Sequence, residues 1–382
     1  MRIAGLALQY FRLHKSLTIQ FEQPVTLIIG SNASGKTSIL EAISLLSTGK
    51  SFRALKIAEM VALDQELARV KGVVQTEAKP SLYDQTAAAL AENSLVNQEQ
   101  QTLEILLTKG LVNGQRAAYR LFSVNEVRRQ QRKATGILKV VVFRPEDMRL
   151  VEGSPGRRRS YFDAPLAMLY DDYEQALKSY EQVLKRRNKL LLLVGEGKQS
   201  KSVLEYWNIN LIKHGEVIQE YRRKFISLAP TVTFPIQLQM EYQPSVISEE
   251  RIKQYLEKEI AAGHTLIGPH KDDFFITYLH HDSAEPLNIA LYGSRGQQRL
   301  AVLWLKLVEL AYVEQQAVER PVLLLDDIFS ELDPPSQSLI LDLITTGQTI
   351  ITTIDPDLEL FLHARFDGRL QVVRMEERSL TE

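Results

Sequence analysis

The sequence predicts an α/β fold with an antiparallel β portion and an inserted, mainly helical lobe. Uninterrupted apolar runs near both chain ends predict buried strands, at 25–29, 322–325 and 349–353. Between them, residues 157–228 carry apolar side chains at three-and-four spacing, which predicts helices that each bury one face. We therefore expect a head assembled from both ends of the chain, residues 1–149 and 266–382, with the helical lobe at 150–265.

The composition is that of an ordinary globular protein. The 382 residues are 45% hydrophobic and 24% charged, and the formal net charge is −1. Any contact with nucleic acid must therefore use a local basic face. The lack of cysteine excludes disulfides, zinc-thiolate sites and thiol catalysis. No run approaches the roughly 18 apolar residues of a membrane span, and the N-terminus lacks the apolar region of a signal peptide. We expect a cytoplasmic protein without membrane contact.

Residues 1–29 predict two or three strands that lead into a phosphate-binding loop. The strand at 25–29 is followed by Gly-x-x-x-x-Gly-Lys-Thr and then by an amphipathic helix, the context that such a loop requires. The glycines let successive N–H groups point at one anion, and the helix adds its positive end. Lys36 would reach the β- and γ-phosphates of ATP, and Thr37 would bind Mg²⁺. The predicted nucleotide contacts are Gly30, Ser31, Asn32, Ala33, Ser34, Gly35, Lys36, Thr37 and Ser38.

The next part of the chain predicts a β portion with a basic segment. Residues 67–75 and 103–122 are typical of hairpin strands, and the polar segment 79–101 between them predicts a surface insertion. Residues 116–139 are rich in arginine and lysine, with few acids to offset them. Such a cluster is more often a solvated face than a binding site.

The remaining elements alternate between strands and helices. In order, we expect a strand at 140–143, helices at about 157–193 and 202–228, a strand pattern from 232, a short helix at 249–262, a strand at 274–279 and a helix at 300–313.

Two carboxylates follow the apolar strand at 322–325. Asp326 offers Mg²⁺ a hard oxygen ligand beside the phosphate loop, and Asp327 could polarise the attacking water. Alone, two acids at a strand end would be better explained as exposed side chains, but the phosphate loop favours the functional interpretation. Lys36 and Asp327 are the predicted catalytic residues, and Thr37 and Asp326 the predicted metal ligands.

A second element suited to an anion precedes this strand. Ser294, Gly296 and Gln297 open a long helix and offer a hydroxyl, backbone N–H groups and a helix N-terminus. The order of phosphate loop, helical lobe, this element and acidic strand resembles the ABC-type ATPases. In that superfamily, the serine-glycine-glutamine element contacts the nucleotide held by a partner subunit. The resemblance implies a two-fold homodimer that traps ATP between head-to-tail sites.

Within that superfamily, the chain resembles the RecF family over essentially its whole length. Besides the phosphate loop, the resemblance is carried by residues 50–53, 143–147, 153–159, 268–273, 293–299 and 323–333. It implies a DNA-binding, weakly active ATPase of replication, repair and the SOS response. ATP would drive dimerisation on single- and double-stranded DNA, at the junctions of gaps, and hydrolysis would release it. RecO and RecR would then help to load RecA.

The chain departs from better-known patterns at several positions. Ala33 stands where glycine is common in the loop, and Asp327 is shorter than the glutamate of transporters. Thr352 and Thr353 stand where transporters place a histidine, His363 lies too far along to replace it, and no glutamine lies near Glu146.

Other functions stay open from the sequence. The ATPase subunit of a membrane transporter would want that histidine and a shorter chain ahead of the serine-glycine-glutamine element. A small-molecule kinase would not need this element, and a binding module that uses ATP only for structure looks the same in residues. DNA contacts would be phosphate-directed, with candidates Arg128, Arg129, Arg132, Lys185, Arg186 and Arg187.

Overall fold

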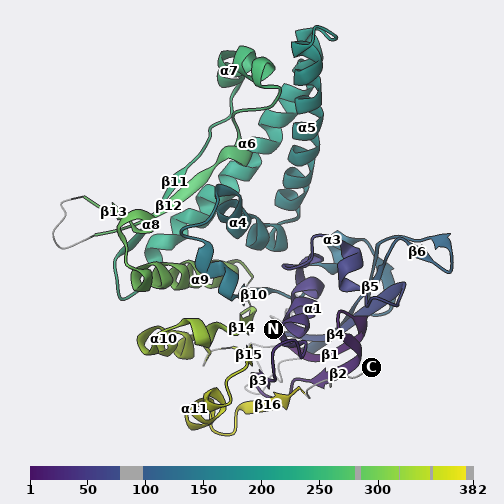
Figure 1. Ribbon diagram of the computed structural model, residues 1–382, viewed down its shortest axis with the longest axis vertical. Coiled ribbons are helices and arrows are strands. Elements are labelled where there is room, and N and C mark those ends of the chain that lie inside the picture. Colours follow the sequence, from purple (N-terminus) through teal and green to yellow (C-terminus); the bar gives the residue numbers. More distant parts are fainter. Residues whose placement is uncertain (78–97, 280–284, 318, 345–346, 376–382) are drawn as a thin grey trace, which may run out of the picture. The chain divides into compact units, whose positions relative to one another are not determined.

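The computed structural model describes residues 1–77, 98–279, 285–317, 319–344 and 347–375. The chain divides into two compact units (Figure 1), Met1–Pro145 with Val313–Glu382 as unit 1, and Glu146–Tyr312 as unit 2. Unit 1 is an α/β head with a parallel and an antiparallel sheet, and unit 2 is mainly helical. The predicted fold class is confirmed.

A parallel sheet forms one layer of unit 1, with strand order β10-β14-β15-β3-β16. These strands are Val140–Phe143, Val322–Asp326, Thr349–Thr353, Val25–Ile29 and Leu370–Arg374. The three predicted apolar strands are its three inner strands, β14, β15 and β3, and all of their residues are buried. Their parallel register brings the carboxyl ends of β14 and β15 together, so that Asp326 pairs with Thr352.

An antiparallel sheet forms the second layer, with strand order β2-β1-β4-β5-β8-β9. These strands are His14–Gln20, Arg2–Phe11, Leu67–Glu77, Gln98–Thr108, Arg120–Val124 and Val127–Arg129, and a short hairpin, β6 (Leu111–Val112) and β7 (Gln115–Arg116), precedes β8. The hairpin strands expected at 67–75 and 103–122 are confirmed in β4, β5 and β8. Residues 98–101 of the expected insertion belong to β5, and its residues 79–97 lie outside the described residues.

Helix α1 (Lys36–Thr48) contacts strands of both sheets, and 11 of its 13 residues are buried. One apolar core joins the layers, with Leu6 from β1, Ile43 from α1 and Leu324 from β14 all at most 2% exposed. The carboxylate of Glu41 is also buried, because Arg12 donates to it from Nε at 2.8 Å and from Nη2 at 2.6 Å. The shorter helices of this unit are α3 (Gln131–Ala134), α10 (Pro334–Ile344) and α11 (Asp357–Arg365).

Unit 2 packs helices around a small antiparallel sheet. Its helices are α4 (Pro155–Leu169), α5 (Asp171–Gly195), α6 (Glu205–Leu228), α7 (Glu249–Ala262), α8 (Ile289–Tyr292) and most of α9 (Arg295–Ala317), and its sheet is β11-β12-β13 (Leu238–Gln243, Asp273–Tyr278, Leu287–Asn288). Buried aromatic rings of Tyr161, Phe162, Phe225 and Phe274 pack at centroid distances of 4.9 to 5.8 Å. Short 3₁₀ turns lie at Ile57–Met60, Pro145–Arg149, Lys201–Leu204, Ala229–Thr231, Pro269–Lys271 and Ile328–Glu331.

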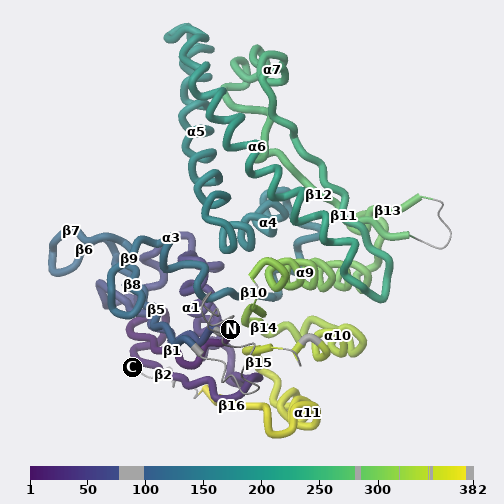
Figure 2. Tube along the Cα trace, turned by 180° about the vertical axis from the view of Figure 1, so that it is seen from behind, coloured from purple at the N-terminus to yellow at the C-terminus, as the bar shows by residue number. Residues whose placement is uncertain are grey.

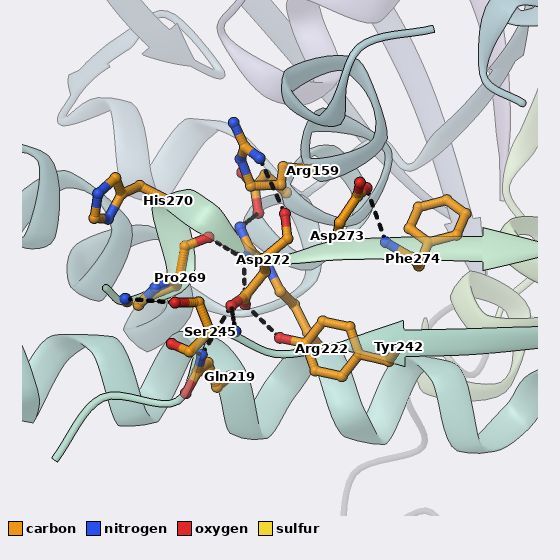
Figure 3. Close-up of polar contacts among 12 residues, drawn as sticks. Arg159, Gln219, Arg222, Tyr242, Ser245, Pro269, His270, Asp272, Asp273 and Phe274 are labelled. Carbon is orange, nitrogen blue, oxygen red and sulfur yellow. Dashed lines mark hydrogen bonds and ion pairs between the residues drawn. The ribbon is translucent and has the colours of Figure 1, made fainter. Parts of the chain in front are cut away.

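The sequence phrase at 268–273 forms the polar centre of unit 2 (Figure 3). Asp272 is 1% exposed and accepts hydrogen bonds from Gln219 Nε2 at 2.9 Å, the Ser245 N–H at 2.8 Å, Arg222 Nη1 at 2.8 Å and the Tyr242 hydroxyl. A buried carboxylate needs this many donors to replace water. The phrase therefore holds β12 to α6 and β11, a structural role.

Two expectations about the helical lobe differ from the structure. The single helix predicted from about 157 to 193 is wrong, because the extended backbone of Tyr170 (φ −129°, ψ 114°) separates α4 from α5. The expected boundary at 265/266 also differs from the compact units, which keep 266–312 with the helices. Pairing of β12 with β11 and a 2.6 Å hydrogen bond from the Tyr161 hydroxyl to Leu305 O hold this segment there.

In the part of the chain that is described, no helix has both the length and the apolar character needed to span a membrane.

Candidate nucleotide-binding site

The phosphate loop joins β3 to α1, and its backbone is bent into left-handed conformations. Gly35 has φ 99°, and a Cβ at this position would lie 2.5 Å from His14 Nε2, so only glycine fits. His14, 2% exposed, donates from Nε2 to Gly35 O over 3.1 Å and fixes the end of the loop. Ala33 adopts φ 65°, which costs a residue with a Cβ about 1–2 kcal/mol. This strain is the physical consequence of alanine at a position where glycine is common.

The Lys36 side chain closes the phosphate loop by donating hydrogen bonds to the backbone of earlier loop residues. Its Nζ donates to Gly30 O and Ser31 O, both at 2.8 Å, and the residue is 7% exposed. Burial lowers the pKa of this ammonium, against the opposing charges of Asp327 and Asp326.

The loop also contains a donor that fits a phosphate oxygen. Ser34 Oγ is shielded from solvent and makes no hydrogen bond within the described residues. A Cβ on Gly30 would lie 2.7 Å from it, so the cradle around Ser34 exists only because residue 30 is glycine. At the helix side, Ser38 is buried and its N–H donates to Gly35 O at 3.0 Å. An unpaired hydroxyl and a helix N-terminus together fit the phosphates of ATP.

The two predicted metal ligands contact each other. Thr37 Oγ1 donates to Asp326 Oδ1 at 2.9 Å, and Thr352 Oγ1 donates to the same atom at 2.8 Å. The described residues contain no cluster of three or more His, Cys, Asp or Glu that could hold a metal ion alone. One hydroxyl and one carboxylate nevertheless fit Mg²⁺, which binds such sites together with nucleotide phosphates and water.

Asp327, the predicted catalytic base, directly follows Asp326 at the end of β14. Its backbone is left-handed (φ 49°), and its N–H donates to Thr352 O and Thr352 Oγ1, both at 3.1 Å. Burial raises the pKa of the Asp327 carboxyl, and Asp326 and Glu331 act in the same direction, while the Ile354 N–H and Lys36 oppose them. Its Oδ1 is shielded and has no hydrogen-bond partner among the described residues. A carboxylate with a raised pKa and an unused oxygen can accept a proton from water.

Sequence reasoning noted Thr352 only as a departure from the transporter histidine. The structure gives it a role, because it positions both acids from the neighbouring strand. The sequence signal was a hydroxyl at the end of a buried strand next to an acidic one. His363 lies in α11, with its Nε2 3.8 Å from Glu359.

The serine-glycine-glutamine element opens α9 in unit 2. The Ser294 N–H donates to Gln297 Oε1 at 2.8 Å and the Gln297 N–H donates to Ser294 Oγ at 3.3 Å, a reciprocal capping box. Ser294 and Gly296 are exposed. The capping box therefore presents a pre-formed helix N-terminus to solvent, and contact of these residues with a nucleotide stays a prediction.

The candidate DNA contacts separate by burial. Arg128, Arg129, Arg132, Lys185 and Arg186 are exposed. Arg187 is 0% exposed and donates from Nη2 to Glu259 Oε2 at 2.6 Å, from Nη1 to Thr265 Oγ1 at 2.8 Å and from Nε to Asn208 Oδ1 at 2.7 Å. The prediction of Arg187 as a DNA contact is therefore wrong, because its guanidinium is fully used inside unit 2.

Comparisons with known proteins agree on one family. The model of the RecF/RecN/SMC N-terminal domain matches residues 2–374. The DNA replication and repair protein RecF of Bacillus cereus (strain G9842) is 34% identical over 94% of this chain and 93% of its own length. RecF of Bacillus cytotoxicus is also 34% identical over the same shares. Two solved structures of the recombination mediator protein RecF in the RecFOR pathway, one with ATPrS and one with ATP, superpose with TM-scores of 0.76 and 0.75 at 29% identity. They cover 93% of this chain and 93% and 92% of their own chains.

Proposed function

This chain belongs to the RecF family, and we propose that it is an ATP-switched, DNA-binding recombination mediator of replication and repair. The observation that carries the proposal is the meeting of Thr37, Asp326, Asp327 and Thr352 beside the phosphate loop, within hydrogen-bond distances of 2.8 to 3.1 Å. This is the arrangement that phosphoryl transfer from ATP to water requires.

The residues have separable roles in hydrolysis. Lys36 and the loop N–H groups orient the phosphates, and Thr37 with Asp326 would hold Mg²⁺, which neutralises charge on the phosphates when bound. Asp327 orients the attacking water and accepts its proton, and Thr352 keeps both acids in position. Because the aspartate reaches less far than the glutamate of transporters, we expect slow turnover. We also expect DNA to stimulate this turnover.

The switch is dimerisation. We propose that ATP joins two copies head to tail, with Ser294, Gly296 and Gln297 of one copy contacting the nucleotide of the other. The capping box supports this role, because it leaves an exposed helix N-terminus that can meet an anion without rearrangement. The ATP-bound dimer would bind single- and double-stranded DNA at gap junctions in the cytoplasm, and hydrolysis would release it.

The partners follow from the family. A mediator of the RecFOR pathway would act with RecO and RecR, and through them help to load RecA during repair and the SOS response. The transporter alternative has no support in the relatives, which match 94% of this chain and are named as DNA replication and repair proteins.

Sedimentation tests this proposal directly. The protein is centrifuged without nucleotide, with ADP and with a non-hydrolysable ATP analogue, each with and without gapped DNA. We expect a monomer that dimerises only with the analogue and then holds DNA. Ser294→Arg should still bind ATP as a monomer but no longer dimerise. A wild type that stays monomeric throughout, or a Ser294→Arg variant that dimerises normally, would contradict the switch.

A further inference from the structure

Unit 1 contains an open pocket away from the phosphate loop, with a volume of about 600 Å³. Residues of β8, β9 and α3, which lie next to one another in Figure 2, line it together with Ile57 and Tyr119. Its volume is in the range of about 300–1,000 Å³ that accommodates small ligands. The pocket is too small for a DNA duplex but large enough for one or two nucleotides of a single strand.

Two cationic residues at this pocket are available to a ligand. Arg128 and Arg129 line it and are exposed, and neither forms an ion pair with another residue of the described ranges. They follow one another on β9, opposite Ser123 and Phe122 of β8. Consecutive strand residues point to opposite faces of a sheet, so the two guanidinium groups stand apart, and each offers bidentate donors to a separate phosphate.

An aromatic ring completes the pocket. Tyr119 is 57% exposed, and its ring lies against Gly110, where a Cβ would be only 2.9 Å from the ring carbons. One side of the ring is thus supported and the rest is open to solvent. An open ring and an apolar floor at Phe122 suit a base, whereas an acidic peptide offers no ring to stack.

The pocket is connected to the helix of the phosphate loop. Arg120 Nη1 donates at 2.5 Å to the carbonyl oxygen of Gly49, which caps the C-terminus of α1. A Cβ on Gly49 would lie 2.8 Å from Gln131 Nε2. One rigid helix therefore joins the pocket at its C-terminal end to the phosphate loop at its N-terminal end.

We propose that this pocket binds a single DNA strand, with phosphates on Arg128 and Arg129 and one base stacked on Tyr119. The proposal rests on the proposed function and specifies where its single-stranded substrate binds.

The test measures binding of a fluorescent oligothymidylate and of a duplex of the same length, with the ATP analogue present. Tyr119→Ala should weaken oligothymidylate binding about 5- to 150-fold, the range for loss of one stacked base, and leave duplex binding unchanged. Tyr119→Phe should retain wild-type affinity because it keeps the ring. Arg128→Gln with Arg129→Gln should reduce the slope of log affinity against log salt by about 1.4, since each single-strand phosphate contact contributes about 0.7.

The matched control is Lys15→Gln with Arg369→Gln, which removes the same charge from exposed residues of unit 1 outside the pocket. It should bind the oligothymidylate like the wild type, and all variants should retain affinity for a fluorescent ATP derivative. If the pocket variants bind the oligothymidylate normally while the wild type binds it too, the pocket assignment is wrong and the proposed function stands. If the pocket variants lost binding to a polyglutamate peptide but still bound the oligothymidylate like the wild type, the assignment would also be overturned. A wild type that binds no DNA would refute both proposals.

Discussion

Thr352→Val removes one hydroxyl from the centre of the site and tests the role assigned to the strand next to the acids. Thr352 is fully buried, and valine fills nearly the same volume. The change deletes the 2.8 Å hydrogen bond to Asp326 Oδ1 and one of the two acceptors of the Asp327 N–H. A hydrogen bond to a charged group contributes about 1.5–3 kcal/mol. The Asp327 N–H retains Thr352 O as a partner, so its loss adds little. We expect a loss of about 2 kcal/mol in unfolding free energy.

The same change should weaken binding of ATP only when Mg²⁺ is present. The change removes the Thr352 hydroxyl that orients Asp326 Oδ1, and loss of such support typically lowers metal affinity about 10–100-fold. Titration of a fluorescent ATP derivative with Mg²⁺ and with EDTA measures this difference, and urea unfolding measures stability.

Thr353→Val is the matched control. It is the same substitution one residue later, at a buried hydroxyl that accepts a hydrogen bond from the Asp355 N–H at 3.0 Å. It should leave the Mg²⁺-dependent part of ATP binding unchanged. Equal Mg²⁺-dependent losses in both variants, or no loss in Thr352→Val, would refute the positioning role.

Three further changes test other parts of the molecule. Lys36→Arg should impair hydrolysis and retain some ATP binding, because a planar fork replaces a compact ammonium; steady-state turnover measures it. Asp327→Asn should slow hydrolysis about 10²–10⁴-fold and stabilise the nucleotide-free protein. Burial raises the pKa of this carboxyl above 3.8, so its ionised form destabilises the folded state. Arg187→Gln should cost about 3–5 kcal/mol, because it leaves the Glu259 carboxylate buried and unpaired. Lys201→Gln, in an exposed ion pair, should cost less than about 1 kcal/mol.

Each of these has a distinct contrary result. Unchanged turnover in Lys36→Arg would count against the phosphate-loop assignment. For Asp327→Asn, the wild type and the variant should be equally stable below pH 3.8, the ordinary pKa of the carboxyl. Their stabilities should diverge as the pH rises from 3.8 through the raised folded pKa of Asp327. Over this range the unfolded wild type has released a proton that the folded wild type still holds, so its stability falls with pH. A gap that is constant with pH would refute the burial argument. Equal costs for Arg187→Gln and Lys201→Gln would mean that the buried pair is not desolvated.

The sequence by itself determined the features that depend on local order. The strand-loop-helix context of Gly30 to Thr37, the two acids after an apolar strand and the capping residues at Ser294 are written in consecutive residues, and their geometry follows from backbone chemistry. The family resemblance also rested on such short phrases, and the comparisons confirm it.

Only the tertiary structure decided which distant side chains meet. Thr352 lies 26 residues from Asp326 in the sequence. The parallel register of β14 and β15 nevertheless places Thr352 Oγ1 2.8 Å from Asp326 Oδ1. Arg187 looks like its neighbours Lys185 and Arg186 in sequence, yet the helical rotation of α5 turns it inward to Glu259. Burial and register are properties of packing between elements, and no local pattern states them. For the same reason, the pocket beside Tyr119 exists only where β8, β9 and α3 come together.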